Sequence, residues 1–519
     1  MIYTINNCIR AFGYTNFDNL IADMGSVDNL KAYVIANGYA DIAVAEDTEL
    51  LLVDVNGKTW HTGCYGAVIE PPKPYLCFTS TGDSTVSMKQ KGTPNTSAGK
   101  VIQYKLNDGE WQTWDLSEVS LHDGDMMYLK SADEIPMSEA IYTYKYFIMG
   151  GSISASGNIM SLLNFSDTAP NYCFNCLFDK CSALTQAPEL PAINLGFYCY
   201  MRMFKECTGI VVAPALPATT MVDYCYRCMF QGCTSLITAP ELPATTLSNS
   251  CYAEMFNGCT SLTQAPELPA TNLDAASGCY ASMFQGCTSL VQAPELPTTS
   301  YIREYCYASM FKGCTSLVNA PQLPCNSLGE SCYANMFSGC TSLVQAPELP
   351  ATMLNRECYA AMFSGCTSLT QAPELQAVEL KYRCYKQMFN GCTSLTNAPA
   401  LPATTLAEEC YNEMFNRCTS LVQAPSLPAT TLANYCYSYM FNGCTSLTQA
   451  PSLHATTLVQ GCYAEMFMNC TSLVQAPELQ ATTLAPYCYI EMFSGCSILN
   501  YVKAMFTEVP SEGNPVGSW

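Results

Sequence analysis

The chain has 519 residues, of which 49% are hydrophobic and 13% are charged. This composition supports a continuous core and is unlike that of a disordered chain. Forty-three acidic and 22 basic residues give a formal net charge of −21, and no cluster of lysine and arginine is visible. Since nucleic acids and anionic lipids are bound through such clusters, we expect no nucleic acid partner. No apolar run reaches about 18 residues, so we expect no membrane insertion either.

Residues 1–70 are predicted to form a small α/β module. Residues 16–39, NFDNLIADMGSVDNLKAYVIANGY, favour a helix, with Asp28 as a plausible N-cap. Residues 41–60 favour a pair of strands. The start of the sequence shows no basic segment followed by an apolar core, and we therefore expect no Sec-type signal peptide.

A second module, predicted to be β-sandwich-like, covers residues 71–149. Three prolines between positions 71 and 74 mark a linker ahead of it. Residues 101–114, VIQYKLNDGEWQTW, alternate around an Asn-Asp-Gly turn, which is a signal for a β-hairpin. Residues 150–172 are placed where the first unit of the following repeats needs a cap. Residues 499–519 are predicted to form a C-terminal cap and tail.

Residues 173–498 consist of thirteen repeats, most of them 26 residues long. The repeat that starts at Cys251 has its second cysteine at Cys259, and the same spacing recurs in every repeat. The step is longer only twice, between Cys251 and Cys279 and between Cys279 and Cys306. Because 26 of the 32 cysteines follow this period, the cysteine content is a property of the repeat. The period lies in the range of leucine-rich repeats, in which each unit is one turn of a solenoid.

Each repeat is predicted to contain a short strand and a short helical turn. Residues 261–265 suit a brief strand, which must end where Pro266 cannot donate a ladder hydrogen bond. Residues 251–256 have apolar positions at the spacing of a helical or 3₁₀ turn. The predicted core positions of two successive repeats are Cys251, Phe256, Cys259, Leu262, Cys279, Phe284, Cys287 and Leu290.

The repeats resemble the BspA-like leucine-rich repeats, whose units carry the signature AF-x-GC-x-SL. The matching residues of one repeat are Met283, Phe284, Gly286, Cys287, Ser289 and Leu290. The resemblance covers residues 173–498 and implies a β-rich leucine-rich-repeat solenoid of 13 coils. An Ala-Pro-Glu-Leu-Pro segment replaces the isoleucine-rich strand end of that family. A β-module followed by SGNIMSLL ahead of the repeats also looks like repeat proteins of gut Bacteroidales and their phages.

The residues that suggest chemistry each have a simpler structural interpretation. Neighbouring cysteine copies would lie close enough for disulfides, but their side chains point the same way, so buried free thiols are favoured. Two CxxC strings, at residues 173–176 and 225–228, could indicate zinc or redox chemistry. With three histidines in the chain, we expect no metal and no cofactor. The glutamates of the Ala-Pro-Glu segments are interpreted as a solvated edge. No Ser/His/Asp grouping can be argued, so we expect no enzyme.

The residues that vary just before each Cys-Tyr pair form the candidate recognition surface. Insertions in repeat proteins gather on one face, often the binding face, and both length changes fall there. The alternative is a set of tolerated surface loops. The candidate residues are Asp274, Ser277, Tyr301, Arg303, Glu304, Tyr305, Tyr435 and Tyr487.

These observations favour a non-enzymatic recognition protein. The expected host context is a bacteriophage virion, as a tail or head fibre assembled in the host cytoplasm. Residues 1–70 would attach to other virion proteins, and the repeats would bind a host surface glycan or protein; we expect a homo-oligomer. The alternatives are a BspA-type adhesin of the bacterial cell surface and a purely structural virion component.

Overall fold

The chain forms two separate units, Met1–Tyr75 and Leu76–Trp519. The computed structural model describes residues 51–53, 59–61, 68–69, 74–93, 100–271, 273–297, 299, 301–323, 325–510 and 512–518. In the first unit, β1 (Leu51–Val53), β2 (Thr59–His61) and β3 (Val68–Ile69) form an antiparallel sheet in that order. The helix predicted over residues 16–39 lies outside the described residues.

The second unit begins with two β-sheets, which we call the β-module. The larger sheet has the order β14 (Leu184–Gln186), β12 (Ile153–Ser156), β4 (Leu76–Ser80), β9 (Met126–Lys130), β6 (Gln103–Leu106) and β7 (Gln112–Thr113). The smaller sheet has the order β10 (Ser138–Ala140), β11 (Thr143–Gly150), β5 (Ser84–Lys91) and β8 (Val119–Leu121). Strands β6 and β7 form the hairpin that the sequence predicts.

The two sheets pack face to face through aromatic side chains. The ring of Phe78 on β4 lies 5.1 Å from that of Phe147 on β11, at an interplanar angle of 88°. Trp114 and Phe178 also pack on Phe147, with ring centroids 6.2 and 5.0 Å away. Because Phe178 belongs to the first repeat, the core of the β-module continues into the repeats.

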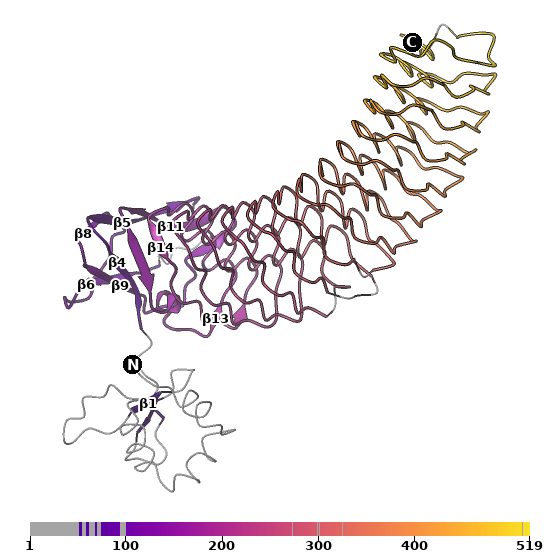
Figure 1. Ribbon diagram of the computed structural model, residues 1–519. Helices are drawn as coiled ribbons and strands as arrows, with labels where there is room; N and C mark the ends of the chain where they lie inside the picture. The colour runs from indigo at the N-terminus through magenta and orange to yellow at the C-terminus, as the bar shows by residue number, and fades with distance from the viewer. Residues whose placement is uncertain are drawn as a thin grey trace, which may run out of the picture. The chain divides into compact units, whose positions relative to one another are not determined.

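Residues 147–172 run beside the first repeat as if they were the preceding coil. The N–H groups of Phe147 and Ile153 donate to Leu177 O and Ala183 O, at 2.8 and 2.9 Å. Strand β12 pairs in parallel with β14, and β13 (Thr168–Ala169) pairs in parallel with β15 (Asn194–Leu195). Between them lies the 3₁₀ segment η1 (Ile159–Leu163), all of whose residues are buried. The β-module, this cap and the repeats therefore form one unit (Figure 1).

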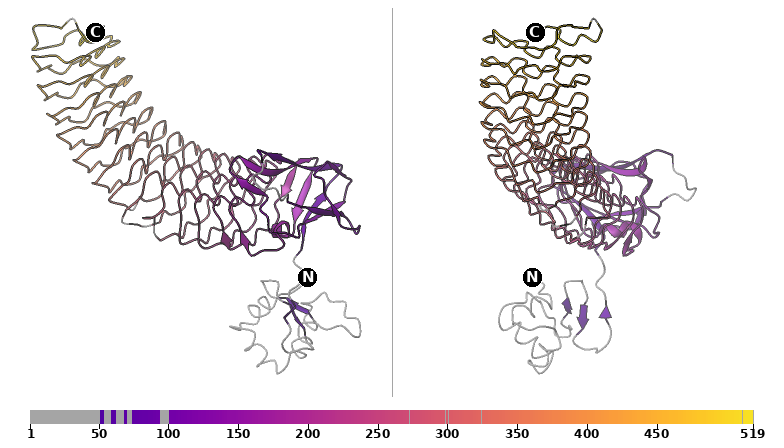
Figure 2. Two further views of the ribbon diagram at one scale, coloured as in Figure 1. Left: turned by 180° about the vertical axis from the view of Figure 1, so that it is seen from behind. Right: turned by 90° about the vertical axis from the view of Figure 1, so that its right-hand side faces the viewer.

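From Cys173 onward, the repeats follow one another as stacked coils (Figures 1 and 2). We number the coils by their first cysteine, from coil 1 at Cys173 to coil 13 at Cys488. The strand predicted at residues 261–265 is reduced to one parallel bridge per coil, such as the bridge from Gln264 to Gln292. Among the described residues, η1 is the sole helical segment. The fold is thus β-rich and built of repeats, as predicted.

The predicted helical turn at residues 251–256 is wrong. In its place lies a segment of consecutive turns, residues 250–258, which we call the turn row, with an equivalent in every coil. Alternate N–H groups donate to the next coil: Tyr252 to Cys279 O at 3.0 Å and Phe256 to Met283 O at 2.9 Å. The N–H groups between them bond to the carbonyl three residues back.

The backbone of the turn row explains why it is not a helix. Ser250, Glu254 and Gly258 have positive φ angles of 49°, 58° and 77°, so every fourth residue is left-handed. An α-helix directs all of its N–H groups along its own axis and would leave none to join the coils. Here the inter-coil bonds replace the helical ones.

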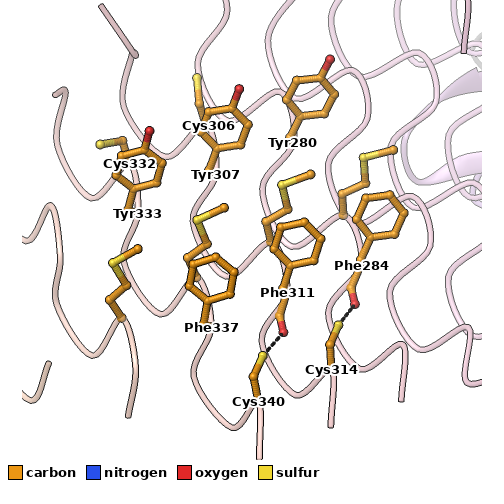
Figure 3. Packing of buried hydrophobic residues seen from close by; sticks show 14 of the residues in the cluster. Tyr280, Phe284, Cys306, Tyr307, Phe311, Cys314, Cys332, Tyr333, Phe337 and Cys340 are labelled. Atoms are coloured by element: carbon orange, nitrogen blue, oxygen red, sulfur yellow. Dashed lines mark hydrogen bonds between the residues drawn. The ribbon is translucent and has the colours of Figure 1, made fainter. Parts of the chain in front are cut away.

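The interior is made of columns of identical side chains. All eight predicted core positions are fully buried. In the column of tyrosines, the rings of Tyr280 and Tyr307 stack 5.7 Å apart, and Phe284 and Phe311 do the same (Figure 3). Within the described residues, every cysteine is buried with a free thiol.

The second cysteine of each repeat has a role that the sequence did not reveal. Cys314 Sγ donates to Phe284 O at 3.0 Å, and Cys340 Sγ donates to Phe311 O at 3.1 Å (Figure 3). The same bond recurs along the stack. Burial raises the pKa of Cys340 to about 12, so its thiol stays protonated as a donor and is a poor nucleophile.

The end of the chain covers the last turn row. The N–H groups of Tyr487, Tyr489 and Glu491 donate to the carbonyl oxygens of Gly513, Pro515 and Gly517, at 2.7, 2.8 and 2.8 Å. Part of the predicted tail therefore takes the place of a following coil.

Candidate functional site

The surface of the turn row carries the side chains that differ most between coils. Two positions in each coil form two parallel columns along the stack. The first column, which precedes each Cys-Tyr, holds Tyr172, Tyr198, Tyr224, Ser250, Gly278, Tyr305, Ser331, Glu357, Arg383, Glu409, Tyr435, Gly461 and Tyr487. The second column, four residues later, holds Cys176, Arg202, Cys228, Glu254, Ser282, Ser309, Asn335, Ala361, Gln387, Glu413, Tyr439, Glu465 and Glu491.

Every residue in both columns has a positive φ angle. For a residue other than glycine, this conformation costs on the order of 1 kcal/mol and persists only where the surroundings impose it. Here the hydrogen bonds to the next coil impose this conformation, and these bonds involve only main-chain atoms. The identity of the side chain is therefore free to change without altering the backbone.

Six of the eight predicted recognition residues lie around coils 5 and 6, where Ser277 and Glu304 contact each other across coils. Ser277 Oγ donates to Glu304 Oε2 at 2.8 Å, and Arg303 forms an ion pair with Glu304 at 3.5 Å. The hydrogen bond from Ser277 lowers the pKa of Glu304. Tyr305, which is 48% exposed, donates to Glu330 Oε1 at 3.3 Å.

The remaining two members of that cluster are less prominent. Thr299 Oγ1 donates to Asp274 Oδ1 at 3.1 Å. The side chain of Tyr301 is half-buried, and burial raises its pKa. The cluster around Glu304 thus satisfies most of its polar groups internally and is a weaker candidate for ligand binding.

Tyr435 and Tyr487, the other two predicted residues, lie five and seven coils further along the first column. Between them the column has Gly461, and a side chain at this position would collide with the ring of Tyr435. Gln460 Nε2 donates to the hydroxyl of Tyr435 at 2.7 Å. The glycine therefore allows Tyr435 to lean over coil 12.

A groove of about 530 Å³ lies between the two columns over coils 9 to 13. We call it the C-terminal groove. Its floor consists of Asn412, Ser438 and Ala464, which are all buried. One wall includes Tyr435 and Tyr487 from the first column.

The other wall of the C-terminal groove comes from the second column. It consists of Glu413, Tyr439 and Glu465, and the hydroxyl of Tyr439 donates to Glu465. Burial raises the pKa of Glu465, and the neighbouring carboxylate of Glu491 adds to this effect. This side of the groove is therefore acidic and aromatic.

At the coil 9 end of the groove, the positive charges are already paired. Arg383 and Lys386 both bond to Glu409, with shortest distances of 2.9 and 2.6 Å. Burial opposes ionisation of Glu409, but the hydrogen bonds from the two cations lower its pKa overall.

Sequence reasoning missed most of this surface. Tyr172, Tyr198 and Tyr224 stack with ring centroids 5.1 and 4.6 Å apart, and they belong to the same column as the predicted tyrosines. Listing the residue before the first cysteine of every repeat would have found them. The second column gives no comparable signal, because a left-handed residue at every fourth position leaves no pattern of residue types.

The described residues show no metal centre and no membrane-spanning helix. Among them, no group of three or more histidine, cysteine, aspartate or glutamate side chains is placed to hold a metal ion. The same residues form no helix of the length and apolar character needed to cross a bilayer. The cysteines of both CxxC strings are buried.

Comparison with known proteins finds a match for part of the repeats. Residues 279–421 and 375–500 match the family model of the BspA type leucine rich repeat region (6 copies). No curated protein and no solved structure matches the chain. Residues 279–500, less than half of the chain, are thus similar to leucine-rich repeats of the BspA type.

Proposed function

We propose that this chain is a non-enzymatic recognition protein of the surface or adhesion type, which binds its partner through the two columns of the turn row. The observation that carries this proposal is the contrast between interior and surface. Buried positions such as Phe284 and Cys287 repeat along the stack, whereas the side chains of the two columns change at most steps from one coil to the next. A main chain that is bonded coil to coil lets those side chains vary at little cost.

The biological setting that we favour is a phage virion, in which the chain would be a tail or head fibre that meets a host surface glycan or protein. Residues 1–70 would attach it to other virion proteins, and the fibre would be a homo-oligomer. The buried free thiols support folding in a reducing compartment, such as the cytoplasm in which virions assemble. The alternatives are a bacterial cell-surface adhesin and a purely structural virion component.

Binding to intact host cells tests the recognition role. We expect the full chain to adhere, and the triple variant Tyr305→Ser/Tyr435→Ser/Tyr487→Ser to adhere at least tenfold less. Serine already occupies this column at Ser250 and Ser331, so the backbone should be retained.

The matched control is Val291→Thr/Val318→Thr/Val344→Thr, which changes three exposed residues away from the turn row to a residue that other coils carry there. Equal adhesion of both triple variants would contradict the proposal. Immunoblots of density-gradient fractions separate the settings: the chain should band with intact phage particles, whereas an adhesin would appear in the cell envelope.

A further inference from the structure

The C-terminal groove contains a buried hydrogen-bond acceptor without a donor. Asn412 is 7% exposed, and its side-chain oxygen has no hydrogen-bond partner among the described residues. A buried polar atom left unpaired costs about 1–3 kcal/mol. Since Asn412 lines the floor of the groove, a ligand that brings a donor to this point would recover that cost.

Glu413 and Glu465, the two carboxylates of the second-column wall, also lack cations. Glu413 Oε2 accepts hydrogen bonds from the neutral amides of Gln387, Asn390 and Asn416, at 3.0, 3.3 and 3.2 Å. In the part of the chain that the structure describes, no lysine or arginine forms an ion pair with Glu413, Glu465 or Glu491. The groove therefore carries an uncompensated negative charge beside an unpaired acceptor.

Aromatic rings complete the lining. Tyr435, Tyr439 and Tyr487 all border the groove, and a cation near the face of a tyrosine ring is attracted by the ring quadrupole. The groove thus combines acceptors, negative charge and aromatic rings in one place.

From this combination, we propose that the C-terminal groove binds a cationic side chain, the ammonium of a lysine or the guanidinium of an arginine, on a basic segment of a partner polypeptide. Such groups consist of donors only, which matches a lining rich in acceptors. An anionic ligand would face two carboxylates. A neutral saccharide would gain nothing from the negative charge of Glu413 and Glu465, whereas a cation is attracted by it.

This inference rests on the proposed function, because it names the chemical class of partner for part of the same surface. Its test is fluorescence anisotropy on the full chain with a labelled tri-arginine peptide, compared with the same peptide carrying citrulline, the neutral isostere of arginine. We expect the arginine peptide to bind and the citrulline peptide not to bind.

The decisive variants form a pair matched in charge. Glu413→Gln/Glu465→Gln should weaken binding about tenfold, the effect of losing one hydrogen bond to a charged group. Glu348→Gln/Glu374→Gln removes the same charge from two exposed glutamates of the Ala-Pro-Glu segments and should change affinity less than about twofold. Equal losses in both pairs, or equal binding of the citrulline peptide, would overturn the proposal. A neutral glycan that displaces the arginine peptide would overturn it in favour of a saccharide site.

Two further measurements separate the possible failures. Tyr487→Leu changes a side chain that is 41% exposed and should weaken peptide binding about threefold; it decides the matter if the glutamine pair fails to fold. In the cell-adhesion assay, full adhesion by Glu413→Gln/Glu465→Gln would refute the groove and leave the proposed function intact. Peptide binding with the expected losses, but no adhesion by the parent chain, would support the groove and refute the proposed function.

Discussion

The β-module and the coil stack are joined in one unit, but their backbones make hydrogen bonds in different ways. In the β-module, β11 and β5 pair antiparallel from Tyr144 opposite Lys91 to Gly150 opposite Thr85, so N–H and C=O groups point both ways between the strands. In the stack, Tyr226 donates to Cys251 O and Tyr252 donates to Cys279 O. One peptide unit accepts from the coil before and donates to the coil after, always in the same direction.

This difference separates stability from recognition in the stack. In the β-module, alternate side chains of β5 are buried, and any change there affects the core. In the turn row, the inter-coil bonds need no particular side chain in the two columns. A repeat protein built in this way can alter its surface while keeping its coils in register.

The largest expected difference between the two regions appears at high pH. Burial raises the pKa of Cys340 to about 12 and holds the pKa values of Cys366 and Tyr333 well above their usual ranges. Folded thiols stay protonated where unfolded thiols ionise, so the unfolded state binds fewer protons and stability falls as pH rises above about 9. In that pH range, each such thiol lowers the free energy of unfolding by about 1.4 kcal/mol for every unit of pH.

We expect the circular dichroism of the stack to be lost cooperatively between about pH 9 and pH 11. Trp114, which is buried in the β-module, reports on the other region, and its fluorescence should change later. If the two signals change together, or if the stack stays folded up to pH 11, the predicted difference between the stack and the β-module is wrong.

Removing one buried ring should have the next largest effect. Phe337 stacks between Phe311 and Phe363, with centroids 5.8 and 5.7 Å away. We expect Phe337→Ala to lower the free energy of unfolding by about 3–5 kcal/mol, measured by guanidinium denaturation. Because each coil contacts only its neighbours, hydrogen exchange should rise in the flanking coils and stay unchanged in β11. Phe78→Ala is the matched change in the β-module and should loosen that region instead.

A smaller loss is expected when a thiol donor is removed. Cys366 Sγ donates to Phe337 O at 3.1 Å. Cys366→Ala should cost about 1–2 kcal/mol, since it removes this bond and leaves a small cavity. Cys366→Ser keeps a donor and should cost less in the same denaturation experiment. If serine is as harmful as alanine, the thiol acts only by filling space.

The smallest effect concerns the left-handed positions. Gly365 has a φ angle of 75°, and the nearest atoms to an added Cβ are those of Gly339, 3.7 Å away. There is room for a side chain, so Gly365→Ala should cost about 1 kcal/mol through backbone strain alone. Gly365→Asn should cost less, because asparagine tolerates this conformation and Asn469 occupies the same position in coil 12. Equal melting temperatures for alanine and asparagine would show that strain does not limit this position.

Sequence reasoning succeeded where the repeat makes a pattern visible. The period placed Phe284, Cys287 and Leu290 in the core, and all three are fully buried. The motif around Phe284 and Cys287 pointed to the repeat family that residues 279–500 match. Sequence reasoning went wrong at residues 251–256, where apolar positions at helical spacing line a turn row instead of a helix.

The candidate site was found only in part. The variable residues before each Cys-Tyr were recognised as one surface, and Tyr435 and Tyr487 do border the C-terminal groove. Glu413, Tyr439 and Glu465 were missed, because they lie inside the repeat motif, between its two cysteines. They lie opposite Tyr435 because the turn row is built of consecutive turns. No residue type in the sequence indicates these turns.

By itself, then, the sequence determined the repeat and the buried columns, because burial selects the same residue types in every coil. The tertiary structure decided the rest. Only the stacking of one coil on the next supplies the N–H and C=O partners that hold Ser250 and Glu254 in a left-handed conformation. Hydrogen bonds between successive coils create that conformation, and it places Glu413, Tyr439 and Glu465 in one wall of a groove.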